Sequence, residues 1–287
     1  MLRVGTTRWF VRFGYDGAAF HGWARQPGLR TVEGEIRRGL VRKGAGLSAE
    51  GAELEVASRT DRGVSAVGNV LAVTSPRTGP VLLRSLNGIA EDLFFSAATP
   101  APEGLRVRAA TGRVYRYFEP AGEWDLDRWR ATARLFSGEI DVRSLGRGLA
   151  PDVPVRRSVD VVRVDRAGPV FSIEIRARSF VWGMVRKIVA ALREVDRGRL
   201  SPARLSAALA GTERLTLPLA EPGPLVLWEV QYGIPWQYAW SGPTRHQARA
   251  RAAAEHAVVA RGEVLRALAE AEGRPSDSGS RAAERRN

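Results

Sequence analysis

The sequence predicts an α+β fold built from two similar halves, and the pattern of its apolar residues supports this in three ways. Alternation of apolar and polar residues predicts β-strands at 8–15, 114–119, 159–164 and 170–175, because successive side chains of a strand point to opposite faces. Apolar residues at helical spacing predict amphipathic helices at 31–43, at 125–136 and from residue 181 onward. Each half repeats the same outline of strands, a polar connection and a helix, which indicates two related units.

The first predicted half covers residues 1–112. Its predicted strands lie at 8–15, 54–58, 70–73, 93–98 and 105–110, and its predicted helices lie at 31–43 and 81–90. Thr31 is a suitable N-cap for the first helix, whose apolar residues from Val32 to Val41 fall on one face. Between this helix and the first strand runs a Gly-rich loop that also contains aromatic and basic residues.

The second predicted half covers residues 113–236, and a basic tail follows at 237–287. The predicted strands lie at 114–119, 159–164, 170–175 and 225–230, and the predicted helices lie at 125–136, from 181 onward and at 202–210. Ser201 followed by Pro202 is typical of an N-cap and first helical position, and Gly and Pro predict a loop at 137–154. In the tail, Ala and Arg predict a helix at 244–271, whereas 272–287 has the composition of a disordered segment.

Composition and charge restrict the class of protein. The chain of 287 residues carries a net charge of +13 and has a sequence pI of about 11.2, which favours a polyanionic partner such as nucleic acid. Arg provides nearly all of the positive charge, since Lys43 and Lys187 are the only lysines, and its planar fork suits phosphates and stacked bases. A GC-rich genome is the alternative explanation of the Arg content, although it need not leave the acidic residues so outnumbered.

Several chemistries and locations are excluded or disfavoured. Cysteine is absent, so disulfides, thiol nucleophiles and Cys-ligated metal sites are excluded. The three histidines, His21, His246 and His256, do not have the spacing of metal ligands. No apolar stretch is long enough to span a bilayer, and the N-terminus lacks the apolar region of a secretory signal. We therefore expect a cytoplasmic protein with no membrane partner.

The segment from Leu54 to Val73 places a polar turn between two predicted strands. This turn, Ser58-Arg59-Thr60-Asp61-Arg62-Gly63, holds an acid between two Arg residues, and catalytic groups are often carried by loops on a rigid scaffold. Asp61 is therefore a candidate catalytic residue. The alternative is an ordinary turn Asp whose carboxylate bonds its own backbone.

Two further regions have both a functional and a structural interpretation. The loop YDGAAFHGWARQPGLR carries Arg25 and Arg30 beside Phe20 and Trp23, a combination that suits single-stranded nucleic acid. Its aromatic residues could instead anchor the loop to the core. On the strand at 114–119, Tyr115 either packs in the core or supports a stacked base. Composition leaves both questions open.

The helix from Val181 has the clearest apolar stripe in the chain, and Arg186 and Lys187 lie off that stripe. Arg178 precedes the helix and Arg186 lies near its start, where positive charge opposes the helix dipole by roughly a few tenths of a kcal/mol. Such a local cost is expected where an anion is bound, so both are candidate site residues. A solvated Arg face is the alternative.

The stretch SRTDRGVSAVGNV resembles the signature of the TruA family of tRNA pseudouridine synthases, whose Arg-Thr-Asp-x-Gly-Val core carries the catalytic Asp. Four further stretches resemble the family in the same order, namely YDGAAFHGWARQ, LRVRAATGRVYRYF, RSFVWGMVRKIV and GPLVLWEV. Ser65 and Arg62 stand where bacterial members usually have His and Ala. These departures, together with a shorter segment after Phe136, resemble the archaeal-type branch.

The resemblance implies a role for each matching residue. Asp61 corresponds to the catalytic nucleophile, Arg59 to the Arg that displaces the target base, and Tyr115 to the Tyr that stacks on the target uracil. Arg186 corresponds to the Arg that pairs with the catalytic Asp, and Leu225 to an apolar residue of the pocket. The further RNA-binding candidates are Arg25, Arg30, Arg62, Arg178 and Lys187.

The resemblance also implies a fold, a reaction and partners. It implies a central antiparallel sheet of two similar halves flanked by helices, a homodimer that binds tRNA in basic clefts, and no cofactor or metal. The expected reaction converts uridine to pseudouridine in the anticodon stem-loop, at positions 38–40, and one carboxylate with good positioning can suffice for it. A non-catalytic RNA-binding protein on the same scaffold is the alternative, although it would not need Asp61. A methyltransferase or nuclease would need a cofactor loop or a metal cluster, and the sequence contains neither.

Overall fold

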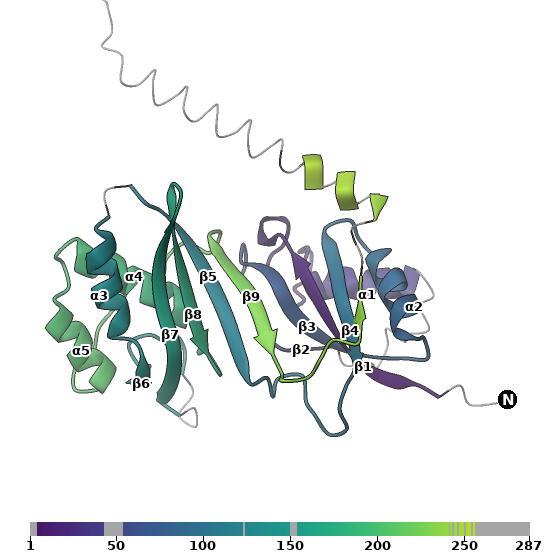
Figure 1. The fold of residues 1–287 in the computed structure, drawn as a ribbon, viewed down its shortest axis with the longest axis horizontal. Coiled ribbons are helices and arrows are strands. Elements are labelled where there is room, and N and C mark those ends of the chain that lie inside the picture. Colours follow the sequence, from purple (N-terminus) through teal and green to yellow (C-terminus); the bar gives the residue numbers. More distant parts are fainter. Residues whose placement is uncertain are drawn as a thin grey trace, which may run out of the picture. The chain divides into compact units, whose positions relative to one another are not determined.

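The computed structural model describes residues 5–42, 54–122, 124–149 and 154–240, together with isolated positions from 242 to 255. The chain divides into two compact units, Met1–Gly242 and Pro243–Asn287. In the second unit the described residues from 245 to 255 are helical, and residues 256–287 of the predicted tail lie outside the described residues. The first unit contains a ten-stranded sheet with helices beside it, so the predicted α+β fold class is confirmed (Figure 1).

The N-terminal strands and helices follow the sequence prediction with small shifts of their ends. The elements are β1 (Thr7–Tyr15), η1 (Gly17–Ala19), α1 (Val32–Arg42), β2 (Glu55–Val56), β3 (Ser65–Ser75), α2 (Gly79–Asn87) and β4 (Leu93–Pro100). Val32, Ile36 and Leu40 of α1 are buried on one face, as their spacing predicts, and the side chain of Val41 lies outside the described residues.

The C-terminal elements are also close to the prediction. They are β5 (Gly112–Pro120), α3 (Leu126–Arg134), β6 (Gly138–Asp141), β7 (Arg156–Ala167), β8 (Val170–Ala177), α4 (Met184–Asp196), α5 (Pro202–Ala210) and β9 (Leu225–Gln231). Ser201 caps α5 by accepting a hydrogen bond from the backbone N–H of Arg204. The helix α4 begins at Met184 rather than at Val181, because Gly183 has a φ of 82° and this left-handed conformation interrupts the helix.

Three local predictions are wrong, each because of a contact with a distant segment. Residues 105–110 form no strand, since three of their carbonyl oxygens accept hydrogen bonds from the side chains of Arg8, Arg113 and Tyr232 instead of from a neighbouring strand. The predicted loop at 137–154 contains β6, which pairs with β7. The strands do not end near residue 230, because β10 (Tyr238–Ala239) pairs with β4.

The two halves meet in the middle of the sheet, where β3 and β9 run parallel. The strand order is β10-β4-β1-β3-β9-β5-β8-β7-β6 with β2 beside β3, and the other pairings are antiparallel. Ser65 lies opposite Val226, so the loop that enters β3 and the start of β9 lie at the same end of the sheet. Parallel pairing therefore brings the loop carrying Asp61 next to residues of the second half.

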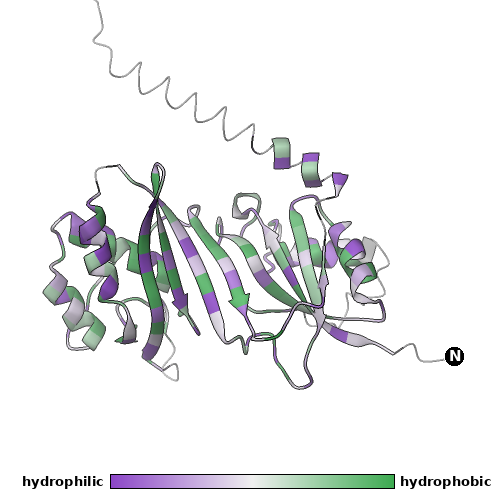
Figure 2. Cartoon of the chain, in the orientation of Figure 1, coloured by the Kyte–Doolittle hydropathy of each residue, from purple (hydrophilic) through white to green (hydrophobic). Residues whose placement is uncertain are grey.

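Each half keeps its helices on its own part of the sheet. In Figure 1, α1 and α2 lie with the N-terminal strands, and α3, α4 and α5 lie with the C-terminal strands. Hydrophobic and hydrophilic residues alternate along β7 (Figure 2), which matches its alternately buried and exposed side chains. The largest buried aromatic side chains include Phe10 and Phe13 in the first half and Trp129 and Phe171 in the second. None of the described helices is long and apolar enough to cross a membrane.

Candidate active site

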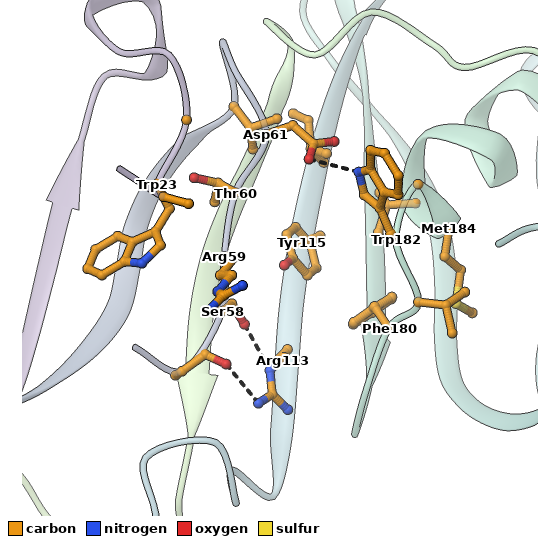
Figure 3. A pocket seen from close by; sticks show the side chains of 18 of the residues that line it. Trp23, Ser58, Arg59, Thr60, Asp61, Arg113, Tyr115, Phe180, Trp182 and Met184 are labelled. Carbon is orange, nitrogen blue, oxygen red and sulfur yellow. Dashed lines mark hydrogen bonds between the residues drawn. The ribbon is translucent and has the colours of Figure 1, made fainter. Parts of the chain in front are cut away.

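A cleft of about 1090 Å³ opens on the face of the sheet where the two halves meet. Its floor comes from β5 and the start of β9, and its walls come from the Asp61 loop, the loop after β8 and the first turn of α4. Figure 3 shows Asp61 and Trp182 at one end of this cleft, Tyr115 in the middle and Arg113 at the other end. The lining includes seven of the predicted site residues, namely Arg59, Asp61, Arg62, Tyr115, Arg178, Arg186 and Leu225.

The loop that carries Asp61 is anchored by hydrogen bonds on both sides of the acid. Asn69 Nδ2 donates to the carbonyl oxygen of Ser58 at 2.9 Å, and the hydroxyl groups of Tyr15 and Thr60 are 2.7 Å apart. The backbone N–H of Trp23 donates to the carbonyl oxygen of Thr60 at 3.0 Å. These contacts fix the backbone before Asp61, so its side chain is presented from a rigid support.

The turn after Asp61 is closed by its own backbone. The N–H of Val64 donates to the carbonyl oxygen of Asp61 at 3.1 Å, and Gly63 adopts a φ of 81° within this turn. Only glycine adopts such a left-handed conformation without a steric cost, which explains why Gly stands at this position of the turn.

Two donors from the C-terminal half bind the carboxylate of Asp61. Trp182 Nε1 donates to Oδ1 at 2.9 Å, and Arg186 Nη1 lies 3.4 Å from Oδ2. Arg186 Nε also donates to the carbonyl oxygen of Ala220 at 2.5 Å, which fixes the guanidinium. The side chain of Asp61 remains 35% exposed, so a substrate can reach it. These contacts favour the functional interpretation of Asp61 over that of an ordinary turn residue.

Tyr115 lies between the core and the cleft. Its ring packs edge-on against Phe180, with ring centroids 4.9 Å apart, and the residue is 8% exposed. Tyr115 pairs with Ile175 of β8 in a regular register, and the β-bulge in the pairing with β9 lies on β9, where Trp228 is the extra residue. Burial raises the pKa of Tyr115, and a hydrogen bond with Ser58 and the charge of Arg113 oppose that rise. The hydroxyl is therefore protonated at neutral pH.

Three of the predicted RNA-binding or substrate-binding arginines are exposed at the cleft. Arg59, Arg62 and Arg178 form no ion pair with any residue that the structure describes. Their charges are therefore available to a polyanion, as the sequence predicts. Leu225 is 5% exposed and contributes apolar surface at the start of β9.

The other basic candidates lie outside the cleft lining. Arg30 forms two hydrogen bonds with Asp92, at 2.6 and 3.1 Å, and its guanidinium lies 4.5 Å from the ring centre of Phe20. Lys187 Nζ donates to the carbonyl oxygens of Ser144 and Gly146, each at 3.1 Å. Arg30 and Lys187 therefore already form contacts within the protein. Arg25 is exposed and lies on the loop before α1.

The aromatic residues of that loop are anchors. Phe20 and Trp23 are only 3% and 2% exposed, so they cannot stack on RNA without unfolding the loop. Backbone hydrogen bonds tie Gly22 and Trp23 to the start of α1, at Val32 and Glu33. Of the two interpretations left open by composition, the structure supports anchoring, and the loop acts as a buttress for the Asp61 loop.

Sequence reasoning misses Arg113, which is 9% exposed and has no carboxylate partner among the described residues. It donates to Ser58 Oγ at 2.9 Å and to three carbonyl oxygens, those of Ala57, Arg108 and Arg178, at 3.1, 3.0 and 2.5 Å. Burial lowers the pKa of Arg113. The signal was present in the alternation of β5, which places residues 113, 115 and 117 on one face.

Trp182 is the second residue that sequence reasoning misses. It lies within the stretch RSFVWGMVRKIV, just before the helix, so it is not part of the apolar stripe. Its side chain is 55% exposed although its N–H binds Asp61. A large aromatic residue between a strand and a basic helix start is the pattern that could have identified it.

The exposed arginines lead to a prediction on salt dependence. Replacing Arg62 with Ala should lower the slope of log Kd against log salt for tRNA by about 0.7–0.9, because one fewer phosphate is neutralised. Arg204→Ala is a matched control, since Arg204 is exposed but pairs with Glu213 at 2.5 Å and lies outside the cleft lining. The measurement is filter binding or anisotropy over a salt series. Equal slopes for both variants would show that Arg62 does not contact phosphate.

A fixed carboxylate, an aromatic floor and unpaired arginines are the parts expected of an enzyme that acts on an extruded nucleotide. Residues 132–233 match the family profile described as tRNA pseudouridine synthase. The tRNA pseudouridine synthase A of Pyrococcus abyssi is 38% identical over 224 residues, covering 77% of this chain and 83% of its own. The enzyme of the same name from Methanocella arvoryzae is 34% identical, covering 77% and 83%. The chain belongs to this family of tRNA-modifying isomerases, so the resemblance found in the sequence is confirmed.

Among solved structures, the chain aligns with an archaeal box H/ACA sRNP Nop10-Cbf5 complex at 14% identity, over 62% of this chain and 43% of that chain, with a TM-score of 0.33. This likeness is too distant to add to the family assignment. Within the part of the chain that the structure describes, no group of three or more His, Cys, Asp or Glu residues could hold a metal ion.

Proposed function

We propose that the enzyme isomerises uridines in the anticodon stem-loop of tRNA, at positions 38–40, with Asp61 as the nucleophile. The observation that supports this most directly is the carboxylate of Asp61, which Trp182 and Arg186 hold at the end of a cleft floored by Tyr115. A carboxylate that is fixed by two donors and still 35% exposed is suited to attack a bound nucleotide.

The reaction needs little besides this carboxylate. The bond between N1 of uracil and C1′ of ribose breaks, and a bond between C5 and C1′ forms. N1 gains a proton and C5 loses one, so substrate and product are isomers. Asp61 supplies the electron pair that assists the cleavage, as carboxylates do at glycosidic bonds, and Arg186 holds the negative charge in position.

The target uridine must leave its base stack before the uracil can be rotated. Tyr115 supports the extruded uracil, and Leu225 provides the apolar side of the pocket. Arg59 is exposed on the loop that carries Asp61, so it can fill the space that the extruded base leaves in the RNA. Arg62 and Arg178 neutralise the neighbouring phosphates.

The proposal includes a homodimer in the cytoplasm, as the resemblance to the family implies. One subunit has a mass of 31.3 kDa, so light scattering of the purified enzyme should give about twice that value. A fully active species with the mass of a single subunit would contradict the dimer without affecting the assignment of Asp61.

The proposed target is tested by tritium release from tRNA labelled with 5-³H-uridine. Release should occur without an added cofactor, and it should fall when uridines 38, 39 and 40 are replaced together by cytidine. A tRNA with cytidine substitutions elsewhere in the anticodon arm is the control. If the triple replacement leaves release unchanged, the proposed positions are wrong, although the reaction itself would stand.

Tyr115 gives a prediction that separates stacking from proton transfer. Tyr115→Phe should keep activity within a few-fold of wild type, because the ring face and its contact with Phe180 remain. Tyr115→Ala should lower activity by about tenfold or more, since stacking is worth about 1–3 kcal/mol per base. Both variants are measured under single-turnover conditions after thermal unfolding confirms that they are folded.

The Ala variant also creates a buried cavity, so its assay must be carried out well below its unfolding temperature. If Tyr115→Phe is as inactive as Tyr115→Ala while both are folded, the hydroxyl takes part in the chemistry. Stacking alone would then not describe the role of Tyr115.

A further inference from the structure

We propose that Trp182 couples RNA binding to the reaction, because its indole N–H positions Asp61 and its exposed ring stacks on a nucleotide next to the target uridine. This inference rests on the proposed role of Asp61 as nucleophile. It assigns a function to a residue that lies outside the five predicted catalytic and substrate-binding positions.

The first part of the inference follows from the contacts of the carboxylate. Asp61 lies on a loop with its side chain 35% exposed, and an ion pair at such a site does not by itself hold one side-chain conformation. The contact from Arg186 is long, at 3.4 Å, and Arg186 Nε is already bound to the carbonyl oxygen of Ala220. The indole N–H at 2.9 Å is the shorter contact. Trp182 therefore fixes Oδ1, and it does so without adding a second positive charge beside the nucleophile.

The second part follows from the exposure of the ring. Trp182 is 55% exposed, more than any other large hydrophobic residue in the described part of the chain. A single exposed hydrophobic residue usually needs no explanation. This residue differs because it lines the cleft and its polar edge already binds the carboxylate, so its orientation is fixed while its surface stays open. A base that continues along the cleft from Tyr115 would meet that surface.

Arg147 packs against the ring of Trp182. Its guanidinium lies 4.6 Å from the ring centre of Trp182, and its backbone N–H donates to the carbonyl oxygen of Trp182 at 2.9 Å. Arg147 is itself exposed, so its charge can reach the phosphate of a nucleotide stacked on the indole. An aromatic face combined with a nearby Arg is the arrangement with which proteins hold single-stranded RNA.

The two parts are separated by two substitutions. Trp182→Phe keeps an aromatic ring but removes the N–H, so we expect kcat to fall about tenfold or more while KM stays within about twofold. Trp182→Ala removes both features, so we expect the same fall in kcat and a rise in KM of about fivefold or more. Trp228→Phe is the matched control, since Trp228 also stacks with an Arg, at 4.0 Å, but lies outside the cleft lining.

The outcomes distinguish this inference from the proposed function. If Trp182→Phe retains the wild-type kcat, the positioning role is wrong, and if Trp182→Ala retains the wild-type KM, the stacking role is wrong. Asp61→Asn is assayed in parallel. An inactive Asp61→Asn with normal Trp182 variants would overturn only this inference, whereas an active Asp61→Asn would overturn the proposed nucleophile and this inference together.

Discussion

Replacing Asp61 with Asn should abolish pseudouridine formation while leaving the fold and the affinity for tRNA nearly unchanged. The amide has almost the same shape as the carboxylate, but it is a poor nucleophile and carries no charge, so turnover should fall by about 10³-fold or more. The ion pair that is lost is partly exposed, with Asp61 35% and Arg186 16% accessible, so stability should change by no more than about 1 kcal/mol.

The measurement is product formation by a stoichiometric amount of enzyme, purified from a host that lacks the corresponding activity. Asp92→Asn is the matched control, because Asp92 also pairs with an Arg but lies outside the cleft lining. It should retain wild-type turnover. Pseudouridine formation by Asp61→Asn at a rate near that of the control would return Asp61 to the role of an ordinary turn residue.

Replacing Arg113 with Met should lower both the stability and the activity of the enzyme. Its guanidinium donates hydrogen bonds to four acceptors on three segments of the cleft wall, at Ala57 and Ser58, at Arg108 and at Arg178. Leaving these acceptors without donors should cost about 1 kcal/mol each, and removing a buried charge offsets part of that cost. We therefore expect the free energy of unfolding to fall by about 2–3 kcal/mol. We also expect kcat to fall about tenfold or more, because Arg113 no longer ties the segment before Asp61 to the other two segments of the cleft wall.

Urea unfolding gives the stability and single-turnover assays give the activity. Arg116→Met is the matched control, because Arg116 lies on the same strand as Arg113 and binds Glu174. Arg163 and Arg176 also lie close to Glu174, at 3.9 and 3.7 Å, so this carboxylate keeps cationic partners when Arg116 is replaced. The control should lose about 1 kcal/mol or less and keep its turnover. If Arg113→Met is as stable and active as this control, the four hydrogen bonds do not organise the cleft.

Local patterns in the sequence were sufficient for most of the fold. Alternation predicts the strand at 8–15, and helical spacing predicts the helices around Ile36 and Ile188. Both patterns show which face of an element is buried, because the order of neighbouring residues sets the periodicity. Capping by Ser201 could be predicted for the same reason, since donor and acceptor are three residues apart. The polar turn around Asp61 was also evident, because turns are determined by a few adjacent residues.

Features that depend on a distant partner could not be predicted in this way. β6 and β10 are short strands that form because they pair with strands elsewhere in the sequence. β6 pairs with β7, and β10 pairs with β4. Residues 105–110 have the composition of a strand, but the side chains of Arg8, Arg113 and Tyr232 donate hydrogen bonds to three of their carbonyl oxygens. The parallel pairing of β3 with β9 joins segments about 160 residues apart, and no local periodicity encodes that register.

The candidate site shows the same division between sequence and tertiary structure. By itself the sequence determined which chemical groups are present, since the motif around Asp61, with Tyr115 and Arg186, identifies a carboxylate, an aromatic ring and a cation. Only the tertiary structure decided which charges are free and which are used, because Arg30 meets Asp92 whereas Arg62 faces the cleft. It also decided that Trp182 binds Asp61, a contact across 121 positions of the chain. The identity of a side chain is local, but its hydrogen-bonding partner is set by the packing of the whole sheet.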